Sequence, residues 1–342
     1  MPRSRACRSR EVPPALGPVM DLNRIYDGDS RAMEEVDDNS IQLIVTSPPY
    51  NVGKDYNYYE DHAPLAQYLE MLMQVWRECA RVLVPGGRLA INVANTNRNP
   101  YLPLHSFIIQ QLLELKFLMR GEILWDKSAT AGVSTAWGSF ARASNPVLRD
   151  THEYIMVFSK GTMRLEKEWT HGDYSGIENM EFVEWTRSIW HKNGTASETL
   201  QEIENSIWHF ATQSKKIKHM LNDVEHPAPF PLDLPLRLIL LYTNVQDIVL
   251  DPFMGTGSTA IAAALTQRRY LGYDISPDYC EIARERIRLY TSQPYIPELA
   301  PRRPPNGNGK SKPAPSGRPR GRPRKNGSVP SNGNGHEPKT EE

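Results

Sequence analysis

The sequence lacks any apolar run of the roughly 20 residues that a membrane-spanning helix requires, so we expect no membrane partner. The N-terminus, MPRSRACRSREVPPALGPVM, contains arginine but no apolar core, which does not match a secretory signal. Its prolines would interrupt an amphipathic helix. We expect residues 1–19 to be a disordered extension, with Met20 as an alternative start. The expected location is cytoplasmic and nucleoid-associated, or nuclear if the source is eukaryotic.

Cysteine is also scarce. The three cysteines, Cys7, Cys79 and Cys280, are far apart and form no Cys-x-x-Cys pair. This spacing gives little support to a disulfide framework or a zinc site, and we expect no metal and a reducing environment. The glycine-rich stretch near residue 255 does not continue into Gly-Lys-Ser/Thr, so it is not a nucleoside-triphosphate P-loop.

An excess of one charge is absent overall, since 40 Lys and Arg balance 40 Asp and Glu. The distribution is uneven, however. Residues 1–10 carry four arginines and no acid, and residues 302–342 carry ten basic and three acidic residues. The body is therefore acidic and both ends are basic, an arrangement in which tails bind a polyanion while the body acts more selectively. We expect residues 297–342, rich in Pro, Gly, Asn, Lys and Arg, to be a disordered tail.

Apolar strands alternate with amphipathic helices along the body, which predicts an α/β fold with a mostly parallel sheet and helices on both faces. Residues 23–50 are expected to form a strand, a short helix and a strand. The expected helices then cover 65–83, 104–120, 226–244, 259–269 and 278–290, and the expected strands cover 88–95, 121–127, 152–161, 247–252 and 269–276. The first of these helices is expected to stop at Pro85-Gly86-Gly87. The periodicity is lost between residues 162 and 222.

The strand Ile41–Thr46 ends abruptly at Ser47-Pro48-Pro49-Tyr50. Prolines are common where a strand leaves a sheet, so an ordinary strand exit is one interpretation. The other is a rigid catalytic loop, because two fixed φ angles would hold the Pro48 carbonyl, the Ser47 hydroxyl and the Tyr50 ring in one geometry.

A second feature is the stretch VLDPFMGTGSTAIAA, in which an apolar strand ends at Asp251 and a helix follows. Gly255 and Gly257 let the backbone turn tightly against a ligand near the helix N-terminus, although they could also serve helix–strand packing alone. The next strand ends at Asp274, where a carboxylate can bind both hydroxyls of a ribose. The acidic Asp251 would repel a pyrophosphate and favours a nucleoside that carries an amino-acid group.

TSPPYN resembles the catalytic motif of DNA amino-methyltransferases, and DPFMGTGST resembles their S-adenosylmethionine-binding motif. The catalytic motif comes first, an order similar to the circularly permuted β group of these enzymes. ILWDK, HEYIMVFSKG and HPAPFPLDLPLRLI resemble the intermediate motifs in the expected order. The resemblance implies a Rossmann-like methyltransferase domain at 20–296. It comprises a catalytic half at 20–161, a target-recognition region at 162–222 and a cofactor-binding half at 223–296.

The resemblance also implies roles for individual residues. Asp251 is expected near the methionine amino group of the cofactor, Asp274 on its ribose and Asp29 on its adenine. Phe230 is expected against the methionine portion, although an Asp-Gly turn and a buried phenylalanine would explain Asp29 and Phe230 equally well. The cofactor residues implied by the motifs are Asp29, Phe230, Asp251, Phe253, Gly255, Gly257, Ser258 and Asp274, and the catalytic residues are Ser47, Pro48, Pro49 and Tyr50.

The implied reaction methylates an exocyclic amino group of a base flipped out of duplex DNA. The Pro48 carbonyl and Ser47 oxygen would accept the two amino protons and localise the nitrogen lone pair, while Tyr50 stacks on the base. The absence of a Pro-Cys dipeptide argues against cytosine-C5 chemistry. Ser-Pro-Pro-Tyr favours cytosine N4, but serine chemistry excludes neither cytosine N4 nor adenine N6.

The tail contains Pro319-Arg320-Gly321-Arg322-Pro323, which resembles an AT-hook that places Arg320 and Arg322 in the A·T minor groove. A generic basic tail is the alternative. Double-stranded DNA is the expected partner, and a homodimer and a cognate restriction endonuclease are further partners that the resemblance allows. Two other function classes stay open: an AT-hook DNA-binding protein with an inactive methyltransferase body, and a methyltransferase of protein glutamine or RNA.

Overall fold

The computed structural model describes residues 20–127, 138–165, 174–191 and 231–292, apart from positions 52, 54, 57, 58, 61, 99 and 149. All of these residues belong to the unit Met1–Arg303. Some expectations fall outside the described residues: the N-terminal extension, Phe230, most of the target-recognition region, and the tail with Arg320, Gly321 and Arg322. Within the described part of the chain, no helix is long and apolar enough to cross a membrane.

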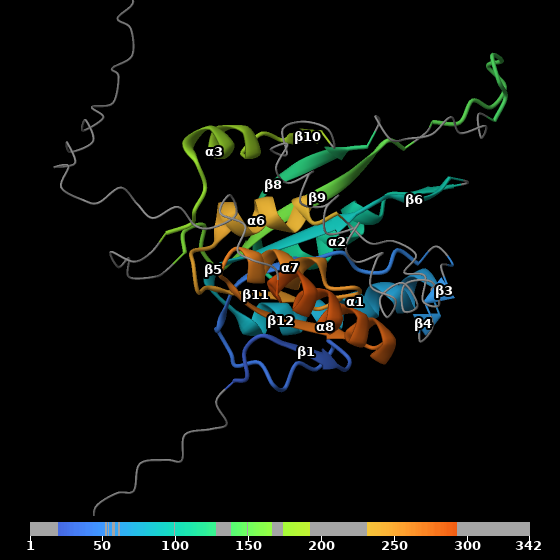
Figure 1. The fold of residues 1–342 in the computed structure, drawn as a ribbon. Coiled ribbons are helices and arrows are strands. Elements are labelled where there is room, and N and C mark those ends of the chain that lie inside the picture. The colour runs from blue at the N-terminus through green and yellow to red at the C-terminus, as the bar shows by residue number, and fades with distance from the viewer. Residues whose placement is uncertain are drawn as a thin grey trace, which may run out of the picture. The chain divides into compact units, whose positions relative to one another are not determined.

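An eight-stranded sheet forms the centre of the described structure (Figure 1). Neighbouring strands are parallel except for β9, which runs antiparallel to both of its neighbours. The order across the sheet is β1 (Arg24–Asp27), β12 (Arg269–Asp274), β11 (Ile248–Asp251), β2 (Ile41–Thr46), β5 (Leu83–Val93), β9 (His152–Lys160), β8 (Phe117–Asp126) and β10 (Ile189–His191). The expected α/β class with a mostly parallel sheet is confirmed.

The sheet is wound in two directions from its middle. Helix α1 (Leu65–Val82) connects β2 to β5, and α7 (Ser258–Leu265) connects β11 to β12 in the opposite direction along the sheet. The winding therefore reverses between β11 and β2, which are neighbours in the sheet. In open α/β sheets, ligands bind outside the carboxyl ends of the strands at such a reversal.

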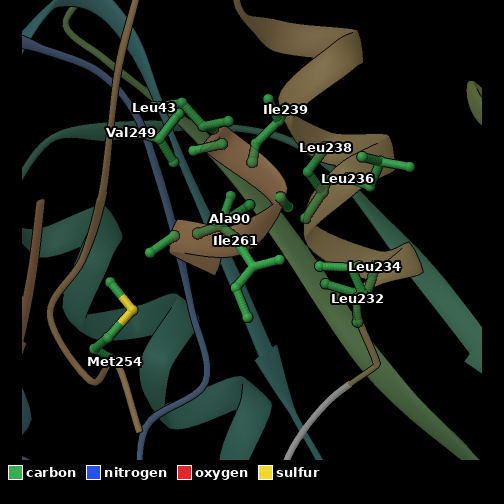
Figure 2. Packing of buried hydrophobic residues seen from close by; sticks show 14 of the residues in the cluster. Leu43, Ala90, Leu232, Leu234, Leu236, Leu238, Ile239, Val249, Met254 and Ile261 are labelled. Carbon is green, nitrogen blue, oxygen red and sulfur yellow. The ribbon is translucent and has the colours of Figure 1, made fainter. Parts of the chain in front are cut away.

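Helices cover both faces of the sheet. The remaining ones are α2 (Leu104–Glu114), α3 (Asn179–Trp185), α6 (Asp233–Tyr242) and α8 (Pro277–Ser292), and two small hairpins pair β3 (Asp55–Tyr56) with β4 (Tyr59–Glu60) and β6 (Thr96–Arg98) with β7 (Tyr101–Leu102). Leu43 and Val249 point to the face covered by α6 and α7, where Ile261 and Ile239 pack against them (Figure 2). Alternate residues such as Ile44 face the other side, where α1 and α2 bury Trp76 and Ile108. The strands are buried on both faces, as a parallel sheet requires.

The short helix expected between the first two strands does not form, so that expectation is wrong. Residues 28–40 follow a series of turns whose backbone groups bond to side chains of α1. Glu78 accepts the Met33 N–H at 2.9 Å, and the Arg81 guanidinium donates to the carbonyls of Met33 and Val36 at 2.7 and 2.8 Å. These tertiary bonds satisfy the backbone without a helix.

Several element boundaries also differ from expectation, two of them where the chain changes direction or register. The helix expected to reach Arg120 ends at Glu114, because Lys116 adopts a positive φ of 65° and the chain reverses into β8. Pro85-Gly86-Gly87 does not separate α1 from the strand but lies inside β5, where the register with β2 shifts. The Pro-Gly-Gly stretch is therefore a bulge in the sheet and not the end of the helix.

Gly86 provides a test of this bulge. Its φ is +74°, and a Cβ there would lie 2.0 Å from the Arg164 carbonyl oxygen. We expect Gly86→Ala to reduce the free energy of unfolding by about 3 kcal/mol or more, measured by urea denaturation. Gly161→Ala is the matched control, because Gly161 has a φ of +67° but nothing within 4 Å of its Cβ position, so only the left-handed backbone costs energy, about 1–2 kcal/mol. Equal losses would show that the close approach to Arg164 is unimportant.

Candidate active site

The carboxyl ends of β11 and β2 are joined by the Asp251 carboxylate. Asp251 is completely buried, with 0% exposure. Its Oδ1 accepts hydrogen bonds from the Thr46 hydroxyl at 2.7 Å and the Phe253 N–H at 3.0 Å, and its Oδ2 accepts from the Thr259 hydroxyl at 2.7 Å. Thr46 precedes Ser47, and Thr259 lies in α7. One carboxylate therefore holds the Ser-Pro-Pro-Tyr loop, the glycine loop and the following helix together.

Enclosure changes the titration of this carboxylate. Burial raises the pKa of Asp251 to about 6, although the hydrogen bonds from Thr259, Thr46 and the Phe253 backbone oppose the increase. Asp274, a second acid nearby, raises the pKa further. Near neutral pH the carboxylate is ionised, but burial disfavours its negative charge. A positively charged group close to it would therefore be stabilised.

The glycine loop is positioned by Asp274. The Asp274 carboxylate accepts the Gly255 N–H at 2.8 Å and the Ser276 N–H at 2.9 Å, and burial raises its pKa despite these two bonds. Gly257 caps α7 in the left-handed region, with φ of 89°, and a Cβ there would lie 2.9 Å from the Ala283 Cβ. Close packing of α7 against α8 therefore requires this glycine, independently of any ligand.

Other expected cofactor residues lie in or next to the same structural elements. Phe253 follows Asp251, is partly buried and meets Trp76 edge to face at 6.4 Å between ring centroids. Ser258 is buried at the first turn of α7. Asp29 follows β1, whose last residue pairs with Asp274. The Asp29 carboxylate bonds the Arg31 side chain at 2.8 Å and its N–H at 2.9 Å, and although burial raises the Asp29 pKa, these bonds bring it below its ordinary value.

The Ser-Pro-Pro-Tyr loop is held by α1. The Tyr68 hydroxyl, almost completely buried, donates to the Pro49 carbonyl at 2.6 Å. Asn51, with a positive φ of 56°, donates to the Ala63 carbonyl at 2.8 Å. Among the described residues no hydrogen bond reaches the Pro48 carbonyl, which leaves it available as an acceptor.

Sequence reasoning missed a polar network beside this loop. The Tyr50 hydroxyl lies 3.1 Å from Ser47 Oγ and 3.4 Å from Glu153 Oε2. Asn92 Nδ2 donates to Glu153 Oε2 at 2.7 Å and to the Tyr50 oxygen at 3.2 Å. Lys127 Nζ donates to the other oxygen of Glu153. β5 supplies Asn92, β9 supplies Glu153, and Lys127 directly follows β8. The antiparallel direction of β9 puts the start of that strand at the carboxyl ends of its neighbours.

No cluster of metal-binding side chains is found in the described part of the chain. Cys79 and Cys280 are buried, free thiols, and burial raises the pKa of Cys280 to about 12.

Comparison of the chain with known proteins shows the family to which it belongs. Residues 41–285 match the N6_N4_Mtase family model, described as DNA methylase. The chain belongs to this DNA methylase family. It is 30% identical over 299 residues to the Type II methyltransferase M.MjaI of Methanocaldococcus jannaschii, an alignment that covers 78% of this chain and 91% of the relative. The expectation of a DNA amino-methyltransferase is confirmed at the level of the family. The expectation that the protein is a methyl-transferring enzyme is confirmed as well.

Solved structures agree on the fold. The putative DNA modification methylase TTHA0409 of Thermus thermophilus, complexed with S-adenosyl-L-methionine, superposes with a TM-score of 0.58 at 29% identity and covers 79% of this chain and 94% of its own. PvuII DNA methyltransferase, cytosine-N4-specific, gives a TM-score of 0.56 at 19% identity and supports the fold alone; the match covers 80% of this chain and 88% of that one. The Rossmann-like methyltransferase fold is confirmed.

The enclosed carboxylate predicts an unusual pH dependence of stability. Because the folded pKa of Asp251 is raised, the stability that it contributes is fully present below about pH 4 and is lost as pH rises through about 6. Asn at this position imitates the protonated acid. We expect the unfolding free energy of the wild type, relative to Asp251→Asn, to fall by up to about 3 kcal/mol between pH 4 and pH 6.5 in urea titrations.

Asp29→Asn is the control of opposite sign. The folded pKa of Asp29 is lowered, so its contribution is present at neutral pH and is lost as pH falls. A flat difference between the wild type and Asp251→Asn over this pH range would contradict the enclosure of Asp251.

Proposed function

We propose that the chain is a site-specific DNA methyltransferase that transfers a methyl group from S-adenosylmethionine to the exocyclic N4 amino group of cytosine in duplex DNA. The observation that carries the proposal is the 2.7 Å bond between Thr46 and Asp251, which places the Ser-Pro-Pro-Tyr loop beside the glycine loop. A nucleophile held by the first loop and a methyl donor held by the second would meet at the strand ends.

S-adenosylmethionine is the cofactor, and the glycine loop has the chemistry to hold it. We assign the methionine amino group to the neighbourhood of Asp251, whose burial and raised pKa favour a nearby cation. Asp274 has carboxylate lone pairs beyond the two that its backbone bonds use, and these suit ribose hydroxyls. Asp29, Phe253, Gly255, Gly257 and Ser258 complete the assignment, together with Phe230. When bound, the cofactor supplies an electrophilic methyl group on a sulfonium sulfur.

The chain's own contribution is to position and polarise the target amine. The lone pair of an exocyclic amine is delocalised into the ring, which makes it a weak nucleophile. The Pro48 carbonyl, fixed because Tyr68 bonds the adjacent Pro49 carbonyl, would accept one amino proton. Ser47 Oγ would accept the other. The Tyr50 ring would stack on the flipped base, a contact worth about 1–3 kcal/mol.

Adenine N6 is the alternative target, because an acceptor pair of this kind suits either amine. Ser47 is neutral, and the described residues beside it do not discriminate a pyrimidine from a purine. We also propose that the chain belongs to the circularly permuted β group, since the catalytic loop follows β2 and the glycine loop follows β11, later in the chain. Residues 162–222 are proposed as the target-recognition region, and a homodimer and a cognate endonuclease as further partners.

The function is tested by expressing the full chain in a host without DNA methylation and sequencing modified bases across the genome. We expect N4-methylcytosine in a single sequence context. Ser47→Ala is the matched variant, which removes one hydroxyl outside the cofactor loop. It should retain S-adenosylmethionine binding by calorimetry while single-turnover methylation falls at least about tenfold, equivalent to about 1.4 kcal/mol. Detection of N6-methyladenine would replace cytosine N4 by adenine N6 as the target. Detection of no modified base would refute the proposed function.

The tail is proposed to bind A·T-rich minor grooves through Arg320, Gly321 and Arg322. Arg320→Ala with Arg322→Ala should weaken binding to an A·T-rich duplex about tenfold and leave a G·C-rich duplex less affected, measured by fluorescence anisotropy. The matched control is Lys310→Ala with Lys312→Ala, which removes the same charge from the tail. Both pairs should flatten the salt dependence similarly, but only the arginine pair should remove the A·T preference. Equal behaviour of the two pairs would mean that the tail is a generic basic extension.

A further inference from the structure

Glu153 is the one carboxylate in the described structure that contacts the catalytic loop through a hydroxyl of that loop. Its side chain is 12% exposed and lies at the start of β9. The Lys127 ammonium fixes Oε1, so Oε2 faces Asn92 and Tyr50. Asp251, a second acid near the loop, is completely buried and accepts hydrogen bonds from Thr46, Thr259 and the Phe253 N–H. None of these three donors belongs to the Ser-Pro-Pro-Tyr loop.

Asn92 sets the direction of the hydrogen bonds. Its amide lies 2.7 Å from Glu153 Oε2, a distance at which a carbonyl oxygen would repel the carboxylate, so the nitrogen must face Glu153. The same nitrogen carries a second proton, which it donates to the Tyr50 oxygen at 3.2 Å. The Tyr50 oxygen is thereby an acceptor, and its own single proton points to a different partner.

Ser47 Oγ at 3.1 Å and Glu153 Oε2 at 3.4 Å both lie within reach of the Tyr50 proton. A charged acceptor makes the stronger bond. With the Tyr50 proton on the Glu153 side, Ser47 donates its own proton to the Tyr50 oxygen. The lone pairs of Ser47 Oγ then face the pocket as acceptors, which is the state that an amino N–H requires.

We propose that Glu153 is the final acceptor of the proton that the target amine loses, through a relay of Ser47 and Tyr50. The proposal rests on the proposed amino-methyltransferase function. As the nitrogen–methyl bond forms, the methyl–sulfur bond breaks and its electron pair stays on sulfur. The N–H electron pair returns to nitrogen as its proton passes to Ser47 Oγ. Ser47 passes its proton to Tyr50, and Tyr50 passes its own to Glu153 Oε2, so that one proton leaves the base and one arrives at the carboxylate.

The relay assigns two separate roles to Tyr50. Its ring stacks on the base, and its hydroxyl carries the proton. Tyr50→Phe removes the hydroxyl alone, so it should interrupt the relay without loosening the base. Glu153→Gln removes the acceptor but retains a side chain of the same size. Asp126→Asn is the matched control, because Asp126 ends the neighbouring strand β8 and bonds His191 at 2.9 Å, outside the relay.

The experiment measures single-turnover methylation, at one fixed pH, of a duplex that the wild type has been shown to modify. Glu153→Gln and Tyr50→Phe should each slow the reaction about a hundredfold, within the usual range for general acid–base groups. The double variant should be no slower than the slower single variant, since both interrupt one relay. Asp126→Asn should react at the rate of the wild type.

Three readouts apart from activity separate the relay from a structural role. The melting temperature, the calorimetric affinity for S-adenosylmethionine, and the fluorescence of 2-aminopurine at the target position should match the wild type in both single variants. A Glu153→Gln rate like that of the wild type would overturn the proposal. So would additive losses in the double variant, or a rate loss that is matched by lost stability or cofactor affinity. In each of these cases the wild-type methylation result stands, so the proposed function is judged separately.

Discussion

The bond from Thr46 to Asp251 is the contact on which the rest of the active site depends. It joins two strands that are neighbours in the sheet but are separated by 205 positions in the chain. A fully buried carboxylate is costly unless donors surround it, and Thr46, Thr259 and the Phe253 backbone supply those donors. The distance between the two loops is therefore determined inside the sheet and does not rely on either loop being rigid by itself.

Sequence patterns were sufficient for the features that depend on neighbouring residues. The ends of β2 and β11 follow directly from Thr46-Ser47-Pro48 and Asp251-Pro252, and the sheet class follows from the alternation of strands and helices. The absent helix at residues 28–40 could not be predicted in this way, because its backbone groups are satisfied by Glu78 and Arg81 of a different element. The end of α2 was likewise not predictable, because Lys116 adopts a positive φ that a lysine in the sequence does not indicate.

Sequence motifs named residues on both sides of the candidate site but did not reveal the polar network around Tyr50. Asp251, Gly255 and Asp274 sit within one strand–loop–helix–strand unit, whose contacts are short-range in sequence. Asn92 and Glu153 contribute to the catalytic side from strands 42 and 103 positions away from Tyr50. Nothing local distinguishes an asparagine or a glutamate in a strand as part of a network. The HEYIMVFSKG stretch was the one available signal, and it pointed to the strand rather than to Glu153.

The attachment of residues 174–191 has a consequence for which parts of the sheet can change in sequence. This segment pairs with the sheet through β10, an edge strand, and the Arg237 guanidinium lies 5.7 and 5.3 Å from the ring centroids of Trp185 and Trp190. Its first residues also accept hydrogen bonds, Tyr174 from the Val245 N–H and Ser175 from the Arg268 guanidinium. Three strands, β5, β9 and β8, separate that edge from β2. Insertions or exchanges of sequence there would leave the bonds around Asp251 intact. Sequence changes at this margin of the sheet and the link between its two central loops are thus structurally separate.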